Sequence, residues 1–308
     1  MGIRAALRQF WAVALCGSSL LAGCRGEAPS RPAAGPVPRR LIALAPSLAE
    51  TLFVLGLGKR VVGVGDYSSW PPEVAGLPRL GGLLDPNFEQ IVALKPDLVL
   101  VLPSQRDLAG KLGRLGIASL VVPSDSLADV ERSFPRIAER CGVPEVGRRL
   151  AGQWRRDLAP RPLSLAQGRR PPKVLLVAGR PPGRLTEILI AGPGTFLDDL
   201  ARRAGGVNAL ADSPMAWPQV NLEEVLHRAP DVIVELRSEP VTPEVAAALR
   251  RDWQRLPGLP AVQAGRISVI GGDYTMIPGP RLPLLYRQLR AAFEASGSAG
   301  EAKGTAAR

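Results

Sequence analysis

The chain has 308 residues, of which 46% are hydrophobic, and it carries a formal net charge of +11. This length is sufficient to bury a large core in one or two domains. The basic excess is not accompanied by a basic run interleaved with aromatic residues, a helix-turn-helix or an RNA-binding signature, so we expect no nucleic-acid partner. We interpret the charge as a solvated surface that favours anionic membranes or anionic ligands.

The amino terminus has the order of features that is typical of a secretory signal. Arg4 and Arg8 precede an apolar run over residues 10–22, which is shorter than the roughly 20 residues of a membrane-spanning helix. The run ends in the sequence LAGC, which resembles a bacterial lipobox with Cys24 as the lipidated first residue of the mature protein. The alternative is an ordinary signal cleaved near Gly23, with Cys24 unmodified.

We therefore expect a lipoprotein signal peptide over residues 1–23, followed over residues 24–39 by the lipidated cysteine and a flexible tether rich in Pro, Ala and Gly. Of the three cysteines, Cys16 lies in the signal, so only Cys141 remains in the folded part. No intramolecular disulfide is then available. Cys141 has no activating neighbour in the sequence, and we expect it to be a small buried apolar residue.

Residues 40–143 predict an N-terminal α/β lobe, because short β-rich runs alternate with helical segments as in a parallel sheet covered by helices. Ser47 and Glu50 are expected to form a capping box at the start of its first helix. The predicted elements are, in chain order, a strand within 40–47, a helix over 48–55, strands over 61–64 and 98–102, a helix over 106–115, a strand over 119–122 and a helix over 127–140.

Residues 144–172 are predicted to contain a linking helix. Apolar residues recur at helical spacing from Val146 to Leu158, which indicates an amphipathic helix. Pro160 and Pro162 should break or kink it.

A C-terminal α/β lobe is predicted over residues 173–294, and a small, polar, disordered tail over residues 295–308. The predicted elements are a strand over 173–178, a helix within 192–206, a helix after 221, a strand over 232–234, a helix over 244–256, a strand over 267–270 and a closing helix over 282–293. The predicted fold class is therefore α/β, with two Rossmann-like lobes joined by a long helix and preceded by a lipoprotein signal peptide.

One stretch of the chain occurs twice. Residues 87–101 read NFEQIVALKPDLVLV and residues 221–235 read NLEEVLHRAPDVIVE, and the two align without a gap at an offset of 134 residues. Each copy predicts a helix of about two turns that is capped by Asn87 or Asn221, ended by a proline and followed by a buried strand. A single duplication at this separation indicates two similar lobes.

Motifs for catalysis are scarce. The sequence contains no GxSxG, phosphate-binding P-loop, CxxC or HExxH. His227 is the only histidine, so a His-rich metal site or His-based catalysis would depend on one residue. We expect His227 to lie on a helix surface, and we expect no catalytic residue, no metal site and no catalytic cofactor.

Aromatic residues gather instead in loops that follow predicted strands. Ligands of open α/β sheets bind beyond the carboxyl ends of the strands, and a mostly apolar pocket with a few polar groups suits a small molecule. Only 5% of the residues are aromatic, so this concentration favours a ligand site, although each ring has neighbouring prolines on which it could simply pack. The candidate ligand-binding residues are Tyr67, Trp70, Trp217, Asp273, Tyr274 and Arg281.

The segments DYSSWPPE at 66–73, NFEQIVALKPDL at 87–98 and AWPQVNLEEVL at 216–226 resemble the class III periplasmic substrate-binding proteins of ABC importers, which deliver cobalamin, ferric siderophores or haem. The resemblance covers about residues 40–294 and is strongest to the members that bind cobalamin. It implies two α/β lobes joined by one long helix and a ligand in a cleft that closes only slightly. It also implies that Tyr67 contacts the ligand and that Trp217 packs on it.

The resemblance gives a role to two acids of the repeated stretch. Glu89 and Glu223 correspond to glutamates, one in each lobe, that dock onto arginines of the membrane permease. Exposed rim charges orient docking more than they add affinity. The alternative is that both acids stabilise helix N-termini by about a few tenths of a kcal/mol.

The sequence departs from the cobalamin-binding pattern at two positions. A tryptophan of the family's cobalamin site falls on Leu83, and an arginine falls on Ile277, although the site aspartate is kept as Asp273.

Other features would suit an anionic ferric chelate or the propionates of haem. Arg180, Arg184 and the GPR segment at 279–281 supply guanidinium groups, which pair bidentately with carboxylates, and Arg180 is therefore a further candidate ligand-binding residue. Tyr67 is a candidate haem ligand.

We therefore expect a monomeric, lipid-anchored, periplasmic or cell-surface component of an ABC importer that binds cobalamin or a related corrinoid. Its partners would be a permease dimer and the ATPase of that permease. The alternatives are a ferric siderophore- or haem-binding protein of the same family, and an exported enzyme that has kept the bilobed fold. An acid–base pair buried in the cleft would favour the enzyme, whereas an aromatic-lined cleft without one would favour binding.

Overall fold

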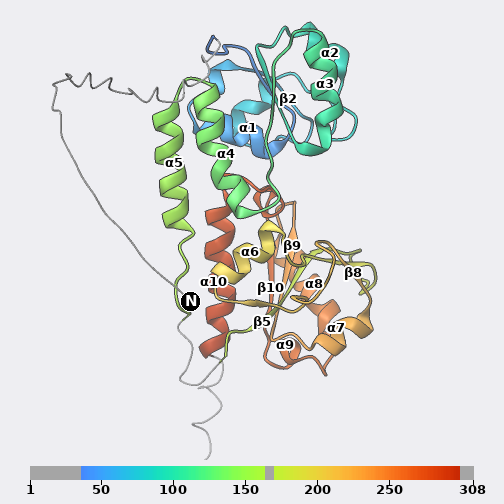
Figure 1. Ribbon diagram of the computed structural model, residues 1–308. Coiled ribbons are helices and arrows are strands. Elements are labelled where there is room, and N and C mark those ends of the chain that lie inside the picture. The colour runs from blue at the N-terminus through green and yellow to red at the C-terminus, as the bar shows by residue number, and fades with distance from the viewer. Residues whose placement is uncertain (1–35, 164–169, 299–308) are drawn as a thin grey trace, which may run out of the picture. The chain divides into compact units, whose positions relative to one another are not determined.

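The computed structural model describes residues 36–163 and 170–298, which form two β-sheets with helices around them (Figure 1). The expected signal peptide, Cys24 and most of the tether lie outside the described residues, as do residues 299–308. Within the described part of the chain, no helix is both long and apolar enough to cross a membrane.

The first sheet is parallel throughout, with the strand order β2-β1-β3-β4. Strands β1 and β3 are completely buried, as their continuous apolar sequences require. The predicted strands and long helices of this lobe are confirmed. The elements are β1 (Leu41–Ala43), α1 (Pro46–Val54), β2 (Val61–Val64), α2 (Phe88–Ala93), β3 (Leu98–Val101), α3 (Arg106–Arg114) and β4 (Ser119–Val121), with 3-10 turns η1 (Gly58–Arg60), η2 (Pro72–Gly76) and η3 (Pro103–Gln105).

The second sheet is mixed, with the order β10-β9-β5-β6-β8 and with β7 paired to β5. Strand β6 runs antiparallel to β5 and β8, which corrects the expectation of a Rossmann-like second lobe. Only residues 180–187 connect β5 to β6, and a parallel crossover needs about a dozen residues or more. The elements are β5 (Lys173–Gly179), β6 (Ile188–Ile190), α6 (Phe196–Arg203), β7 (Val207–Asn208), β8 (Gln219–Val220), α7 (Leu222–Arg228), β9 (Val232–Arg237), α8 (Pro243–Gln254), α9 (Pro260–Gln263), β10 (Ile267–Gly271), η4 (Asp273–Thr275) and α10 (Leu282–Ser298).

The two copies of the repeated stretch form the same local structure, α2–β3 in one lobe and α7–β9 in the other. Asn87 accepts a hydrogen bond from the backbone N–H of Gln90 at 3.0 Å, and Asn221 accepts one from Glu224 at 2.9 Å, so both predicted N-caps are confirmed. Each helix is followed by a residue with positive φ immediately before the proline, at Lys95 and Ala229. The chain thus leaves both helices by the same left-handed turn.

The aspartate that follows each proline accepts hydrogen bonds from backbone N–H groups at the start of the neighbouring strand. Asp97 accepts hydrogen bonds from the backbone N–H groups of Arg39 and Arg40 at 2.7 and 2.9 Å. Asp231 accepts one from Lys173, the first residue of β5, at 2.8 Å. Backbone hydrogen bonds to the charged carboxylate lower the pKa of Asp97. The Pro-Asp pair therefore aligns the central strands of both sheets.

Helices α4 (Leu127–Arg140) and α5 (Pro144–Asp157) lie side by side along one side of the first lobe and extend toward the second (Figure 1). They approach so closely that a Cβ atom on Gly147 would lie 2.8 Å from the carbonyl oxygen of Phe134. The rings of Phe134 and Trp154 meet edge to face with centroids 5.6 Å apart. The start of α4 packs in the core of the second lobe, and its end packs in the core of the first. Although we expected this helix within the N-terminal lobe, it belongs to both cores.

The linking helix is shorter than the expected span of residues 144–172. Helix α5 ends at Asp157, before Pro160 and Pro162, so the predicted break is confirmed. The following segment is tied to α10, because the hydroxyl of Tyr286 donates a hydrogen bond to the carbonyl of Ala159 at 2.7 Å.

Helix α10 continues to Ser298, so residues 295–298, which we expected in the disordered tail, are helical. Cys141 is fully buried at the end of α4, as predicted. Burial raises the pKa of its thiol to about 11, which makes it an unreactive, protonated group at neutral pH.

Candidate functional site

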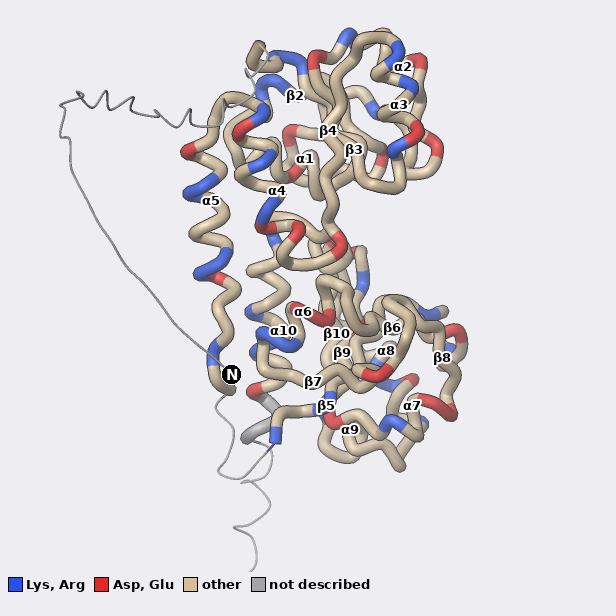
Figure 2. Tube along the Cα trace, in the orientation of Figure 1, with Lys and Arg blue, Asp and Glu red and all other residues tan. Residues whose placement is uncertain are grey.

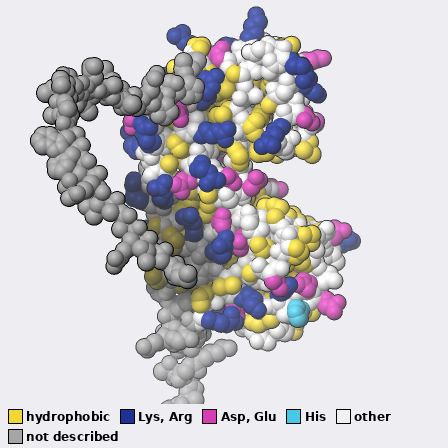
Figure 3. All heavy atoms as spheres, viewed as in Figure 1, with side chains coloured by type: hydrophobic (Ala, Val, Ile, Leu, Met, Phe, Trp, Pro, Cys, Tyr) yellow, Lys and Arg dark blue, Asp and Glu magenta, His cyan; other side chains and the backbone are white. Residues whose placement is uncertain are grey.

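The loops that follow β2 in the first sheet and β10 in the second meet at the junction of the two lobes. The hydroxyl of Ser69 donates a hydrogen bond to Oδ2 of Asp273 at 2.6 Å, although the two residues are 204 positions apart. The carboxyl ends of strands from both sheets therefore face the same region. Figure 3 shows the surface hollowed between the lobes on the right of the view, with hydrophobic side chains on both walls.

Four of the candidate ligand residues come together at this junction. Arg281 donates to Asp273 at 2.6 Å, and its guanidinium carbon lies 5.1 Å from the ring centroid of Trp70 and 5.8 Å from that of Tyr274. Both distances are within the range of cation–π attraction. Burial alone would raise the pKa of Asp273, but hydrogen bonds from Arg281 and Ser69 hold it below its ordinary value.

The second carboxylate on Arg281 comes from Glu50 in α1 of the first lobe. The side chain of Glu50 is 2% exposed and that of Arg281 is 11% exposed. Burial raises the pKa of Glu50, and its ion pair with Arg281 offsets this only in part. Oxygen Oε2 of Glu50 and Nε of Arg281 are buried without a hydrogen-bond partner among the described residues.

This placement shows that the predicted capping box was wrong. Helix α1 begins at Pro46 after Ala45 and has no side-chain cap. Glu50 instead turns inward to Arg281, a partner 231 positions away that the local sequence did not reveal.

Trp217 lines a cavity of about 320 Å³ on the second-lobe side of the junction. Trp217 is 39% exposed, so part of the residue packs on protein and part of it faces solvent. The cavity is also lined by residues that follow β4 and by one residue of the loop just before Arg281. Its lining residues are Ser124, Asp125, Gly194, Thr195, Phe196, Ala216, Trp217 and Pro278.

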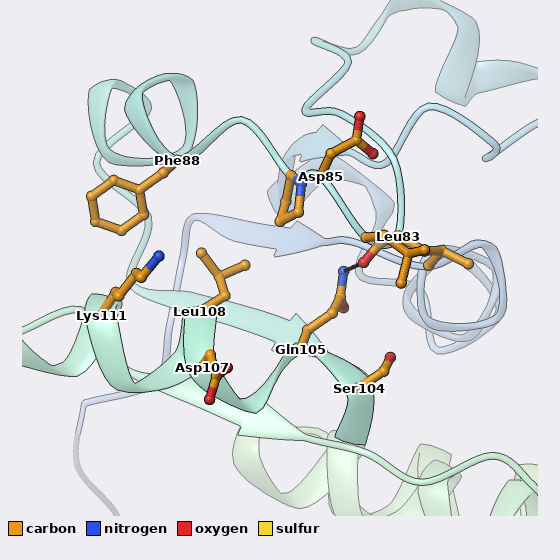
Figure 4. Close-up of a pocket in the computed structure, with 10 residues that line it drawn as sticks. Leu83, Asp85, Phe88, Ser104, Gln105, Asp107, Leu108 and Lys111 are labelled. Carbon is orange, nitrogen blue, oxygen red and sulfur yellow. Dashed lines mark hydrogen bonds between the residues drawn. The ribbon is translucent and has the colours of Figure 1, made fainter.

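A cavity of about 340 Å³ lies on the first-lobe side, at the carboxyl end of β3 (Figure 4). Leu108 and Gln105 point toward the loop that carries Leu83 and Asp85, and the Gln105 amide donates to the carbonyl of Leu83 at 3.0 Å. Half of its lining residues are apolar and half are polar or charged. The charged residues among them are Asp85, Asp107 and Lys111.

Two exposed apolar side chains stand on the same loops of the first lobe. Tyr67 is 68% exposed and Leu84 is 91% exposed. Tyr67 stands close to Gly82, since its Cε2 atom is 3.6 Å from the position that a Cβ of Gly82 would take. Burying such exposed apolar surface against another molecule is favourable.

Arg180 is a correction to the predicted site. Its side chain is 0% exposed and makes ion pairs at 2.9 Å with both Glu235 and Asp252. The guanidinium also lies 5.5 Å from the ring centroid of Trp253. A buried cation requires such partners. Arg180 therefore has a structural role inside the second lobe and does not face a ligand.

Glu89 and Glu223 occupy the first turns of α2 and α7 and are both exposed. Among the described residues, neither carboxylate has a hydrogen-bond or ion-pair partner, so both are available for contacts with another molecule. Figure 2 shows acidic positions at α2 in one lobe and at α7 in the other.

Two α/β lobes whose loops meet at an aromatic-lined junction define a bilobed ligand-binding protein. The sequence matches the periplasmic binding protein family over residues 41–274. It is 31% identical over 246 residues to the vitamin B12-binding protein of Vibrio cholerae serotype O1, which covers 79% of this chain and 84% of that protein. It is 28% identical over 261 residues to the vitamin B12-binding protein of Pectobacterium carotovorum, which covers 83% of this chain and 89% of that protein.

Solved structures agree with the sequence match. The periplasmic vitamin B12-binding protein of Vibrio cholerae superimposes with a TM-score of 0.68 at 26% identity, covering 85% of this chain and 99% of that one. A periplasmic haem-binding protein from Roseiflexus sp. RS-1 gives a TM-score of 0.70 at 27% identity, covering 84% and 99%. The chain belongs to the periplasmic binding protein family. It is of the class III type, a non-enzymatic transport component and not an exported enzyme.

Sequence reasoning missed three groups at the junction: Glu50, Ser69 and the segment Ser124–Asp125. The ion pair of Glu50 was not predicted, because the spacing of Glu50 from Ser47 fits a capping box. Ser69 lies inside DYSSWPPE, and nothing in the local sequence distinguishes its hydroxyl from that of Ser68. Ser124 and Asp125 directly follow a predicted strand, and the rule that ligands bind beyond the carboxyl ends of strands was sufficient to find them.

Proposed function

We propose that this protein is the lipid-anchored binding component of an ABC importer and that it carries cobalamin or a related corrinoid. Proteins of the family deliver ligand to an ABC permease, and the cleft between the lobes is the proposed binding site. The ligand-binding residues in this proposal are Tyr67, Trp70, Trp217 and Tyr274. Asp273 and Arg281 form an ion pair behind the rings of Trp70 and Tyr274.

The observation that carries the choice of ligand is the neutralisation of the arginine at the junction. Arg281 is bound by Asp273 and Glu50 together, so no net positive charge is left to bind an anion. Arg180 is likewise neutralised inside the second lobe by its ion pairs with Glu235 and Asp252. A cleft that needed to bind the carboxylates of an anionic chelate would keep such groups free, because guanidinium–carboxylate pairs supply much of that recognition.

The two cavities support the same choice. A corrinoid has a broad ring with uncharged amide arms, and it needs aromatic and apolar surface with hydrogen-bonding groups at intervals. The first-lobe cavity combines Asp85, Asp107 and Lys111 with apolar side chains, and the second-lobe cavity has Ser124, Asp125 and Thr195 beside Trp217. Neither presents a cluster of positive charge.

A ferric siderophore or haem is the second candidate, and one residue favours it. Arg184 is exposed in the loop after β5, where it is able to pair with a carboxylate of the ligand. The exposed Tyr67 would then be the residue that binds haem iron. The structural similarity to a haem-binding protein is in keeping with this alternative.

Attachment and docking complete the proposal. Cys24 would carry the lipid that holds the protein on the periplasmic or outer side of a membrane, and the protein would act as a monomer. Glu89 and Glu223 would each contact one subunit of the permease dimer, to which the ATPase belongs.

Titration of the purified protein tests the ligand. Cyanocobalamin, haemin and a ferric hydroxamate siderophore are added separately while tryptophan fluorescence and visible absorbance are followed. We expect saturable quenching with cyanocobalamin at micromolar concentration or below. No cobalamin binding at that concentration, together with tight binding of haemin or the siderophore, would replace the corrinoid by an iron ligand.

A further inference from the structure

Arg281 of the second lobe makes two side-chain contacts with residues of the first lobe, Trp70 and Glu50. Trp70 belongs to the first lobe, and the cation beneath its ring belongs to the second. That cation is in turn held by Glu50, which returns to the first lobe. Glu50 and Trp70, both of the first lobe, are thus linked through Arg281 of the second.

The guanidinium of Arg281 is fixed at two points. One terminal nitrogen binds Asp273 and the other binds Glu50, and Ser69 holds Asp273 from the first lobe at 2.6 Å. A planar guanidinium that is fixed at both ends has a set plane, and the rings of Trp70 and Tyr274 lie within cation–π range of its carbon atom. This arrangement is rigid where the ligand site needs rigidity.

Neither Glu50 nor Arg281 is presented to the cleft. Their side chains are almost completely buried, whereas Trp70 is partly exposed. The ion pair therefore lies behind the aromatic rings, and it affects a bound molecule through them.

We propose that Glu50 and Arg281 are positioning residues that set the orientation of Trp70 and, through it, the affinity of the cleft, without touching the ligand. The effect on affinity rests on the proposed function, in which Trp70 contacts the ligand. The effect on the orientation of Trp70 does not.

The second lobe supplies a matched control, since it contains the same kind of triad. Glu235 binds Arg180 at 2.9 Å, and Arg180 lies 5.5 Å from the ring centroid of Trp253. All three residues are buried in a core away from the junction. Glu235→Gln should therefore disturb Trp253 and leave Trp70 unchanged.

The experiment labels the protein with 5-fluorotryptophan and records ¹⁹F NMR spectra of the wild type, Glu50→Gln, Arg281→Lys and Glu235→Gln. Resonances are assigned with the Trp→Phe variants of Trp70, Trp154, Trp217 and Trp253. We expect Glu50→Gln and Arg281→Lys to shift or broaden the Trp70 signal and leave the Trp253 signal in place. We expect Glu235→Gln to do the reverse. A merely structural loss would instead move several signals together.

Cyanocobalamin affinity is measured on the same samples. We expect it to fall by about tenfold in Glu50→Gln, which corresponds to about 1.4 kcal/mol, and to stay unchanged in Glu235→Gln. An unmoved Trp70 signal in both Glu50→Gln and Arg281→Lys overturns the inference. If the Trp70 signal moves while wild-type protein binds no cobalamin, the proposed ligand is wrong and the positioning role stands.

Discussion

The indole N–H of Trp253 donates a hydrogen bond to the carboxylate of Glu235 at 2.9 Å inside the second lobe. The same oxygen accepts two bonds from Arg180, at 2.9 and 3.1 Å. Arg180 also binds Asp252, and Asp252 accepts a bond from the backbone of Gly183 at 3.0 Å. The network therefore anchors the loop after β5 to β9 and α8.

Arg180→Ala should strongly destabilise the protein. Removing one partner of a buried ion pair leaves an uncompensated charge and costs about 3–5 kcal/mol. Urea unfolding followed by circular dichroism would give the free energy of unfolding. Arg202→Ala is the control, because its ion pairs with Asp198 and Asp199 leave the arginine side chain 57% exposed, and we expect a change of about 1 kcal/mol or less. Equal losses in both variants would contradict the structural role of Arg180.

Trp217→Ala should weaken ligand binding and leave stability nearly unchanged. The indole is partly exposed beside a cavity, so its truncation removes contact area for the ligand more than core packing. We expect the cyanocobalamin Kd to rise by about tenfold or more, measured by isothermal titration calorimetry. Leu226→Ala truncates another exposed apolar residue, on α7, and should bind as the wild type does.

The burial of Glu50 predicts a pH-dependent stability. Its pKa is raised above the ordinary 4.5 in the folded protein, so the folded state holds the proton more tightly than the unfolded chain. The contribution of Glu50 to stability is therefore largest below about 4.5 and falls as pH rises through the folded pKa. Asp273, whose pKa is lowered from 3.8, acts in the opposite sense, and its contribution is lost only below that value.

The test compares the free energies of unfolding of the wild type and Glu50→Gln between pH 7 and pH 4.5. The difference between them should move in favour of the wild type as pH falls, by about 1.4 kcal/mol for each unit by which the pKa is raised. Glutamine does not titrate, so the subtraction isolates Glu50. A difference that is constant across this range, or that moves toward the variant, would show that the pKa of Glu50 is not raised.

Glu89→Ala and Glu223→Ala should impair transport while ligand affinity stays as in the wild type. Both side chains are exposed in the first turns of equivalent helices, and in the proposed function they would steer and orient docking onto the permease. Uptake of radiolabelled cyanocobalamin in cells that depend on this protein, and calorimetry on the purified variants, give the two readouts. Glu244→Ala, an exposed acid of α8, is the control. A loss of affinity in either docking variant would place that residue in the binding site.

Much of the fold was available from local patterns. The repeated Asn-to-Pro-Asp stretch predicted two similar helix–strand units, and both have the same caps and the same aspartate contacts. Pro160 and Pro162 predicted the end of the linking helix. These features are set by residues a few positions apart, which is why the sequence reveals them.

The errors share a different cause. Arg180 and Glu50 have partners 55 and 231 positions away, and no local pattern distinguishes an arginine that is free for a ligand from one that is bound in a core. The antiparallel β6 was missed because three residues are too few to show their direction. Of the aromatic loops, Trp70 and Tyr274 are together at the junction, since the loops that carry them follow strands whose ends face one another.

Helix α4 has a consequence for how this chain can be divided. Leu127, Val130 and Phe134 pack with the second lobe, whereas Ile137 and Ala138 pack with the first. A fragment that ends after α4 would expose three large apolar side chains to water, and one that begins after it would leave the second core open. Neither half is therefore an autonomous folding unit, and recombination between relatives at this boundary would give viable chimaeras only where the helix and both of its partner surfaces came from the same parent.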